Sequence, residues 1–570
     1  MASLQKFTVR GRAYWRIVES KRINGKPTPV PVLYIGSTEK LISMLMSAGS
    51  ARPYRVHSFR HGDVAALKAA ADWLGVADII DHIVPTTRRS VSVGTCLVLA
   101  AIGRLVHPCS KRSWADWAQT TSLGQLFPNV DISRMTSQVF WDQMDQVRLE
   151  DLDAIESELA AQVFDRLGLA PDLLFYDTTN FYTYIATTNE RSELAQRGHN
   201  KQKRHDLRQY GLAMAVCGEG RVPIFHQLYP GNRVDSQQFT ESLTVLRKRL
   251  ASLPVKAESV TLVYDRGNMS RPNQALVDGM EFGYVASLTP SQHPELASVP
   301  SSAFEELEWE GSDEVLLVYR TEAEVWGRKR TVVMYFSRKL REGQVRGLLR
   351  NLHRALGQLA EWKERLGRRG SGPRSVRSAE KRMDEILSRQ HLRRVVHVRY
   401  DPEARGSDRL EYWVDDEALN HLVQEVYGRR ILITDRHDWT SRQIIEAYHG
   451  QSDVERVFRE LKDELHLALR PQYHWTDQKV QVHTFTCILG LLLGRVVQAR
   501  AAKLGWRGGL ARLLETLGQV RLALLLDKPG PKGGRPRAHW QLEDTDPQTM
   551  KLFLALVPNS EPFVYTAQSS

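Results

Sequence analysis

Two stretches of the sequence each end a run of apolar residues on an aspartate. In "LLFYDTTN", residues 173–180, this is Asp177, and in "TLVYDRGN", residues 261–268, it is Asp265. Each run has the length and composition of a buried strand, so both carboxylates are expected at strand ends. An aspartate in that position often serves only in a turn or a helix cap. The pattern alone leaves this structural alternative open.

Two carboxylates on neighbouring strands could share a cation. Mg²⁺ prefers carboxylate oxygens and keeps several of its waters. Two such ions, about 3.5–4 Å apart, activate a nucleophile and stabilise the leaving oxygen in phosphoryl transfer. A third carboxylate is normally needed to hold the second ion, so a site of this kind requires one more acid.

The best candidate for the third acid is Glu455, in "YHGQSDVERVFRELKDEL", residues 448–465. At about 100° per residue, Tyr448, Glu455 and Lys462 fall within roughly 60° of one another on one helix, and Gln451 shares their sector. The adjoining face is apolar and comprises Val454, Val457, Phe458, Leu461 and Leu465. The spacing predicts one helix that presents the four polar side chains to one site.

Two features favour a purely structural role for this segment. Ser452-x-x-Glu455 has the form of a capping box, in which Glu455 would only start the helix. Gly450 could break the helix and move Tyr448 out of line with Glu455.

The elements around the two aspartates predict how they meet. Strands are expected at 172–177, 210–218, 222–231, 259–265 and 283–288, with helices near 236–251 and 271–281. The tight "GEGR" predicts a hairpin between the second and third strands, and the helical crossover predicts a parallel return of the fourth strand. The fourth strand then lies beside the first, which places Asp177 and Asp265 on neighbouring strands.

The rest of the chain divides by composition. We expect a β-rich region at 1–60 with a hairpin at Asn24-Gly25, a helical region at 61–168, and an α/β core in two halves. The domain ranges of the core, insertion and tail are 169–290 for the first half, 291–430 for an insertion of strands and helices, 431–505 for the second half, and 506–570 for a C-terminal tail.

The insertion contains a long amphipathic helix with a basic side. Its expected apolar stripe is Val345, Leu348, Leu349, Leu352, Leu356 and Leu359. Arg346, Arg350 and Arg354 recur every four residues opposite that stripe, in a region with 18 Lys or Arg against 6 Asp or Glu between Arg338 and Arg399. The pattern predicts either a clamp for a DNA backbone or a solvated arm that pairs with its copy in a dimer.

The composition narrows the class of protein. The 570 residues carry a net charge of +12, which favours a polyanionic partner, usually nucleic acid. The four cysteines form no C-x-x-C pair, and a signal-peptide core is lacking. The longest apolar runs, "CLVLAAI" and "CILGLLLG", fall far short of a membrane span. We expect a soluble cytoplasmic protein.

The three acids and their surroundings resemble the DDE transposases of bacterial insertion sequences. The class in question carries a Y-x2-R-x3-E-x6-K signature, and this chain reads Tyr448-x2-Gln451-x3-Glu455-x6-Lys462. The blocks "YDTTN" and "YDRGN" resemble those around the first and second family acids. "LYPGNRVDSQQF" and "LRPQYHW" also resemble family sequence.

The resemblance implies a fold and an activity. It implies a ribonuclease-H-like mixed-sheet α/β core, interrupted by an insertion, in which Asp177, Asp265 and Glu455 hold two Mg²⁺ ions that Mn²⁺ can replace. It implies cleavage at transposon terminal inverted repeats, attack of the 3′ end on target double-stranded DNA, and a homodimer in the synaptic complex on the bacterial nucleoid. Tyr448 and Lys462 would contact phosphates, and the helical region 61–168 would bind the DNA ends or form dimer contacts.

One position departs from the signature. An arginine would grip a phosphate bidentately, whereas Gln451 offers only neutral donors, and Arg459 lies about 80° further round the helix, where it partly compensates. The resemblance also implies excision through a DNA hairpin, and the loss of this arginine weakens that expectation more than the expectation of strand cleavage.

Each of three further features has both a functional and a purely structural interpretation. Trp326 could stack on a flipped base, or pack in a β-rich module. The basic segment 197–209 could hold flanking phosphates or be a solvated loop. The segment 532–537, "KGGRPR", could enter a minor groove, but its extra glycine favours a flexible linker.

The resulting expectation is a metal-dependent DNA transposase. The alternatives are a transposase-derived DNA-binding regulator that has lost catalysis and a structure-specific nuclease on the same fold. The intact triad argues against the regulator, and the large insertion with the Tyr/Lys spacing argues against the nuclease.

Overall fold

The chain is described here from a computed structural model. The described residues are 2–23, 26–50, 55–85, 91–169, 172–198, 204, 206–253, 255–308, 316–368, 375–469, 473–527 and 538–558. The basic segment 532–537 and most of 199–205 lie outside them. The chain divides into two compact units, the first made of Met1–Ala69, Ser110–Ser137 and Arg500–Ser570, and the second of Ala70–Cys109 and Gln138–Ala499. Each is described separately.

The first unit holds two small antiparallel sheets. One has the order β1-β2-β3, and Ile23 of β2 pairs with Lys26 of β3, which confirms the predicted hairpin; its turn residues lie outside the described part. The other has the order β17-β16-β4, so strands from the last 50 residues pair with one near the N-terminus. The range 506–570 is therefore not a mere tail. The strands are β1 (Ala2–Val9), β2 (Arg12–Ile23), β3 (Lys26–Ser37), β4 (Arg55–Arg60), β16 (Arg521–Leu526) and β17 (Ala538–Leu542).

Short helices complete the first unit and lead into the second. They are α1 (Thr38–Ser50), α2 (Gly62–Leu74), α5 (Trp114–Ala118), α6 (Leu123–Leu126), α19 (Leu510–Leu517) and α20 (Pro547–Leu556), with α2 crossing the boundary. The helices of the second unit that precede its sheet are α3 (Val76–Ile83), α4 (Val93–Val106), α7 (Ser137–Asp145) and α8 (Leu149–Leu167).

The second unit is built on a nine-stranded mixed sheet, which confirms the expected mixed α/β class. Its order is β10-β11-β12-β15-β9-β8-β5-β6-β7. The strands are β5 (Leu173–Thr183), β6 (Arg208–Cys217), β7 (Pro223–Pro230), β8 (Thr261–Tyr264), β9 (Gly283–Leu288), β10 (Glu305–Leu307), β11 (Leu316–Val325), β12 (Arg328–Phe336) and β15 (Arg429–Thr434). β5, β6 and β7 form an antiparallel meander, and β8 lies parallel beside β5. Both features were predicted from the turn and crossover signals.

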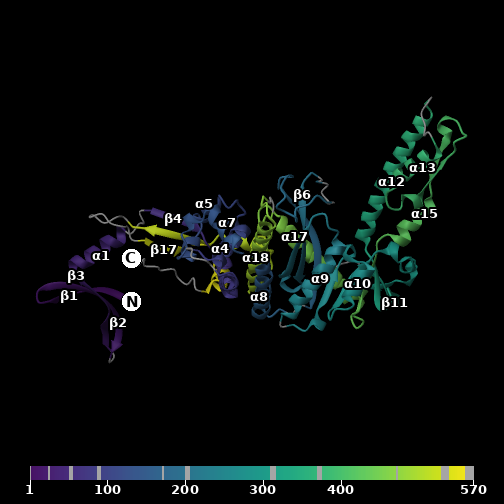
Figure 1. The fold of residues 1–570 in the computed structure, drawn as a ribbon. Helices are drawn as coiled ribbons and strands as arrows, with labels where there is room; N and C mark the ends of the chain where they lie inside the picture. Colours follow the sequence, from purple (N-terminus) through teal and green to yellow (C-terminus); the bar gives the residue numbers. More distant parts are fainter. Residues whose placement is uncertain are drawn as a thin grey trace. The chain divides into compact units, whose positions relative to one another are not determined.

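The sheet runs on into the region expected as an insertion. β12 pairs with β15, and β15 pairs with β9, both antiparallel, so the strands before the long helix extend the nine-stranded sheet. Helices α9 (Asp235–Ala251), α10 (Arg271–Val277), α11 (Pro294–Ala297), α16 (Ser441–His449) and α17 (Gln451–Lys462) accompany these strands, and α9 and α17 can be found beside the sheet in Figure 1.

Residues 338–426 form a helical arm with a hydrophobic core of its own. The arm contains α12 (Arg338–Leu366), α13 (Val376–Ile386), α14 (Leu392–Val395), β13 (Val396–Tyr400), β14 (Leu410–Val414) and α15 (Asp416–His421). The buried stripe of α12 is Leu348, Leu352, Ala355, Leu359, Trp362 and Leu366. Leu349, predicted in the stripe, is 50% exposed. The true stripe alternates steps of four and three residues, and Leu349 lies about 100° from Leu348 on the helix.

Helix α18 (Asp477–Lys503) is longer than its apolar run suggested. By length and composition it could cross a membrane, although 94% of its most apolar window is buried inside the fold. The sequence underestimated it because Thr484 and Thr486 interrupt the run, and both hydroxyls donate to carbonyls one turn back. Gly490 allows α4 to approach closely, since a Cβ there would lie 2.8 Å from the Ala101 carbonyl oxygen.

Candidate active site

Asp177 and Asp265 lie side by side on adjacent parallel strands. In the β5–β8 ladder Tyr176 pairs with Tyr264, and each aspartate is the next residue. Asp177 continues within β5, whereas Asp265 is the first residue after β8. The two carboxylates, about 90 residues apart in sequence, therefore start from the same level of the sheet. The prediction that they sit on neighbouring strands is confirmed.

The face on which the aspartates project follows from the tyrosines before them. The rings of Tyr176 and Tyr264 pack against Phe239 of α9, with centroid separations of 5.0 and 4.8 Å. Successive side chains of a strand point to opposite faces. Asp177 and Asp265 accordingly project away from α9, to the side on which α16 and α17 pack.

Two contacts hold α17 along β5. The amide of Gln451 donates to the Tyr176 carbonyl oxygen at 2.9 Å, and the Lys462 ammonium donates to the Thr179 hydroxyl at 2.5 Å. These contacts run in the same order along helix and strand. Asp177 lies between the two contact points on β5.

The same two contacts orient Glu455. Because Gln451, Glu455 and Lys462 lie within about 60° on the helix, Glu455 falls between the two contacts on the helix face turned toward β5. Its side chain remains exposed. The arrangement brings the third acid toward the strand of the first, as the helical spacing predicts.

The structure excludes the capping box that Ser452 and Glu455 could have formed. Helix α17 begins at Gln451 after Gly450, so Ser452 is an interior residue and no capping box forms. Gly450 does divide α16 from α17. A Cβ at Gly450 would lie 2.2 Å from the ring of Phe175, so glycine permits the junction to press against β5.

Tyr448 reaches the second acid rather than open solvent. Its hydroxyl donates to Asp265 at 2.8 Å and accepts from the Arg430 guanidinium at 3.1 Å. Burial, followed by the Asp265 charge, raises the pKa of Tyr448 well above its usual value, so the hydroxyl stays protonated. The phosphate contact of Tyr448 stays a prediction; in this structure the hydroxyl links the Asp265 carboxylate to the Arg430 cation.

Sequence reasoning missed Arg430 because nothing in "RRILITDR" distinguishes it from an ordinary basic strand end. Arg430 pairs across the ladder with Tyr335, whose pKa burial raises to about 12 although Arg430 lowers it. The Tyr335 hydroxyl lies 3.2 Å from His449 Nε2. Burial and Arg430 lower the pKa of His449, so this imidazole is neutral near pH 7.

Gln451 corrects one prediction. It was expected at the DNA, but only 8% of the residue is exposed and its amide is committed to the backbone of β5. Leu465 also departs from its predicted place, since it is 75% exposed. The reason is that α17 ends at Lys462, so Leu465 no longer follows the helical face.

Two ion pairs also fix α17 in place. Arg221 binds Asp453 at 2.6 Å, and the buried guanidinium of Arg495 on α18 binds Glu460. Burial raises the pKa of Glu460, and the Arg495 charge opposes that shift. Arg459 lies about 80° round the helix from Gln451, away from these two ion pairs, and is exposed.

Trp326 occupies the turn between β11 and β12. It is half-buried, has φ of 53°, and is followed by Gly327 at 79°, the backbone of a tight two-residue hairpin turn. Its ring meets His293 edge-on at 5.4 Å. This packing supports the structural interpretation of Trp326 more than a base-stacking one.

The carboxylates of Asp177, Asp265 and Glu455 have the chemistry to bind a hard divalent cation, but in this structure they are not close enough together to do so. Three carboxylates supply oxygen ligands of the kind that Mg²⁺ prefers, and two of them start from one level of adjacent strands. Among the described residues, however, no three His, Cys, Asp or Glu side chains lie close enough to form a metal-holding group. In this structure Glu455 faces the strand without closing on the two aspartates.

Comparison with known proteins decides the family. A family model described as "Transposase DDE domain" matches residues 170–491, more than half of the chain. The chain belongs to the DDE transposase family. The matched range of this transposase contains Asp177, Asp265 and Glu455. A search of curated proteins gives no match.

Solved structures are also similar to this transposase at low sequence identity, among them one that contains DNA. It is a piggyBac transposase synaptic complex with hairpin DNA, with 9% sequence identity over 80% of this chain and 78% of that chain, and a TM-score of 0.35. Similarity this remote carries no argument about the site.

Proposed function

We propose that this transposase cleaves DNA at transposon ends and joins the 3′ ends to target DNA by two-metal phosphoryl transfer on a ribonuclease-H-like core. The observation that carries the proposal is the common level of Asp177 and Asp265 on adjacent parallel strands, with Glu455 on the helix held over β5. Double-stranded DNA is the partner, which the net charge of +12 suits.

Asp177, Asp265 and Glu455 would hold the divalent ions, Mg²⁺ or Mn²⁺. Bound there, the ions would activate the attacking oxygen and stabilise the leaving one. The chain's own residues orient these carboxylates: Tyr448 holds Asp265, and the contacts of Gln451 and Lys462 hold α17 against β5. Glu455 must swing inward to complete the set.

The finer assignment is to the insertion-sequence class with the Y-x2-R-x3-E-x6-K signature. Tyr448, Glu455 and Lys462 occupy their places in it, and Gln451 replaces the arginine. The buried contact of Gln451 to β5 supports a positioning role at this place, with Arg459 on the exposed side of α17 available to a phosphate.

The test is conservative substitution of each acid. Asp177→Asn, Asp265→Asn and Glu455→Gln should each lower end cleavage by at least 100-fold (~3 kcal/mol), because each removes a metal-binding charge with little change of shape. Binding of the end duplex should stay within about twofold. The readout is cleavage of a labelled transposon-end duplex in Mg²⁺ beside a gel-shift titration.

Two results would contradict the proposal. Wild-type cleavage by Glu455→Gln would remove that residue from the site. Full cleavage in the presence of a chelator would remove the metals, whereas Ca²⁺, with its looser and higher coordination, should permit binding without chemistry.

A further inference from the structure

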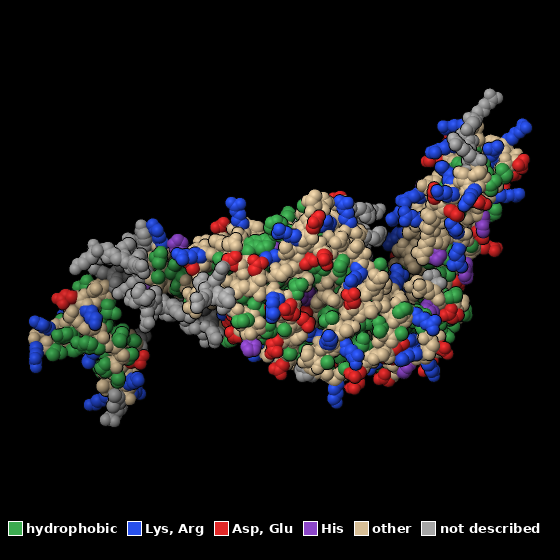
Figure 2. All heavy atoms as spheres, in the orientation of Figure 1, with side chains coloured by type: hydrophobic (Ala, Val, Ile, Leu, Met, Phe, Trp, Pro, Cys, Tyr) green, Lys and Arg blue, Asp and Glu red, His purple; other side chains and the backbone are tan. Residues whose placement is uncertain are grey.

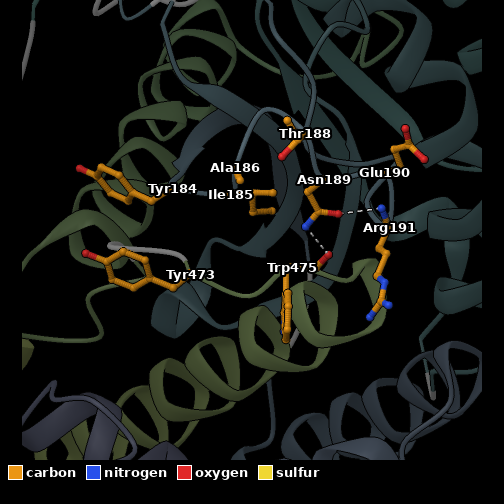
Figure 3. A pocket seen from close by; sticks show the side chains of 9 residues that line it. All are labelled: Tyr184, Ile185, Ala186, Thr188, Asn189, Glu190, Arg191, Tyr473 and Trp475. Carbon is orange, nitrogen blue, oxygen red and sulfur yellow. Dashed lines mark hydrogen bonds between the residues drawn. The ribbon is translucent and has the colours of Figure 1, made fainter.

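An open pocket lies beyond the end of the strand that carries Asp177. It has a volume of about 600 Å³ and is lined by Tyr184, Ile185, Ala186, Thr188, Asn189, Glu190, Arg191, Tyr473 and Trp475. Figure 3 shows its walls: the loop after β5 supplies one, and the segment before α18 supplies the other.

Three aromatic side chains in this pocket are turned to solvent. Tyr184, Tyr473 and Trp475 are 49%, 67% and 55% exposed. The two tyrosine rings stack on each other with centroids 5.4 Å apart. Aromatic rings gathered at one exposed place are uncommon on a protein surface and mark a binding site.

The exposure of Tyr473 and Trp475 is imposed by the residue between them. His474 is only 7% exposed, and its ring packs between Trp141 at 5.3 Å and His483 at 4.6 Å. His474 is turned into the fold, whereas its two neighbours are turned to solvent. The burial of His474 therefore leaves the aromatic rings of Tyr473 and Trp475 exposed to solvent.

The two walls are tied together. The Asn189 amide donates to the Trp475 carbonyl oxygen at 3.0 Å, and Asp477 at the start of α18 accepts from the Ser192 hydroxyl at 2.5 Å and the Glu193 amide at 2.9 Å. Arg208 of β6 donates to the Asn189 carbonyl oxygen at 2.7 Å. A pocket fixed in this way loses little freedom when a ligand binds.

One cation completes the lining. The Arg191 guanidinium lies 6.0 Å from the centre of the Trp475 ring, and the Arg191 amide is held by the Asn189 side chain at 2.7 Å. Figure 3 shows the Glu190 carboxylate turned away from the two tyrosines, on the far side of the pocket. Flat apolar faces beside a positive charge suit a base together with its phosphate.

We propose that this pocket binds an unpaired nucleotide of the DNA, with the base stacked on Tyr184, Tyr473 or Trp475 and the phosphate at Arg191. The proposal rests on the proposed function, since it names a second contact for the same substrate. Tyr184, the first residue after β5, follows Asp177 by seven residues, which is about 23 Å of extended chain. The pocket would therefore hold a nucleotide that flanks the cut rather than the one that reacts.

The test is binding of single-stranded oligo-dT, followed by fluorescence anisotropy. The double variant Tyr473→Ala/Trp475→Ala should bind it about 5- to 150-fold more weakly, the loss expected for one stacked base (~1–3 kcal/mol). Trp475→Phe should bind nearly as wild type, because phenylalanine keeps a stacking face. Arg191→Gln should lower the slope of log affinity against log salt by about 0.7.

Matched controls separate stacking from general damage. Trp413, in the helical arm, is 51% exposed, so Trp413→Ala removes an equally exposed tryptophan and should leave oligo-dT binding unchanged. An oligomer of abasic sites offers the same phosphates without bases, and wild type should bind it as weakly as the double variant binds oligo-dT.

The outcomes distinguish this inference from the proposed function. Wild type that binds and cleaves end duplex but ignores oligo-dT would overturn the pocket and leave the transposase chemistry standing. Equal oligo-dT binding by wild type and the double variant would do the same. Asp177→Asn should bind oligo-dT normally, since the pocket lies apart from the acids; wild type that binds no DNA would overturn both.

Discussion

At the residue scale, the hydroxyl of Tyr448 joins the second acid to the rest of the sheet. It donates a hydrogen bond to the Asp265 carboxylate and accepts one from the Arg430 guanidinium. Because its pKa is raised by burial and by the Asp265 charge, it cannot ionise near neutral pH. Its role is to orient the carboxylate rather than to transfer a proton.

Tyr448→Phe tests that role. The change leaves the ring in place and removes the hydroxyl, so Asp265 loses a donor and turns more freely. We expect cleavage to fall by about 10- to 100-fold, as for other residues that orient a ligand to a metal. Affinity for the end duplex and the pH profile should not change, which rate measurements from pH 6 to 9 and gel shifts would check. A loss of affinity instead would make Tyr448 a DNA contact.

The direction in which the Gln451 side chain points could not be predicted from the sequence. The sequence predicted correctly the side of the helix on which Gln451 lies and its closeness to the site. The pattern could not say whether a residue in that sector looks outward or into the strand, because this depends on how deeply Gly450 lets the helix settle on Phe175. Arg430 was missed for a related reason: its partners, Tyr335 on β12 and Tyr448 on α16, are brought to it only by the folded sheet and helix.

At the scale of elements, the junction between α16 and α17 sets the height of the third acid. Gly450→Ala places a methyl group 2.2 Å from the Phe175 ring. The helix pair must lift off β5, so we expect a loss of about 1–3 kcal/mol of unfolding free energy. Cleavage should fall steeply, because Glu455 moves with the helix. Denaturation and cleavage assays would measure the two effects.

Gly343 provides the control for that substitution. It lies in α12, and a Cβ there has no atom within 4 Å. Gly343→Ala should be neutral or stabilising by up to about 1 kcal/mol, since alanine favours a helix interior. Equal effects of the two substitutions would contradict a specific role for the junction.

The basic side of α12 is the second prediction at this scale. Arg346, Arg350 and Arg354 are exposed, as their spacing predicted, and Figure 2 shows Lys and Arg side chains gathered over the arm. Replacing all three by Gln should weaken binding to end and random duplex alike. The slope of log affinity against log salt should fall by about two to three, one phosphate contact being worth about 0.9.

Arg365 in the last turn of α12 and Arg368 just after its end supply the control for the arginines. Arg365 and Arg368 pair with Glu361 at 3.6 Å and Glu364 at 2.7 Å. Their replacement by Gln removes charges that are already partly neutralised, so the slope should change less. An unchanged slope in the triple variant, with impaired dimerisation, would assign this side of the arm to protein contacts.

At the scale of the whole molecule, local patterns predicted the elements and missed their long-range grouping. The β5–β8 pairing follows from a hairpin and a crossover, which are short-range signals. The pairing of β16 with β4 joins residues more than 450 positions apart, and no local pattern signals it. The addition of β11 and β12 to the catalytic sheet was missed similarly, since a hairpin carries no mark of the sheet it joins.

His61 lies where the three segments of the first unit meet. Its Nδ1 is 2.7 Å from the Ser122 hydroxyl, its backbone amide donates to Val520, and its ring packs edge-on against Phe553. The side chain is fully buried, and burial lowers its pKa to about 4 from an ordinary value of 6.5. Protonation of His61 is therefore coupled to the folding of this unit.

The direction of that coupling predicts acid sensitivity. Between about pH 6.5 and pH 4 the unfolded chain binds the proton and the folded unit does not, so stability falls as pH falls through this window, by up to about 3 kcal/mol. The neighbouring buried carboxyl of Asp63 has a raised pKa and acts with the opposite sign. A variant that removes only the imidazole, His61→Gln, isolates the histidine contribution. Urea denaturation near pH 7 and pH 4.5 should show a smaller acid loss in the variant than in wild type, and parallel losses would mean that His61 is already protonated in the fold.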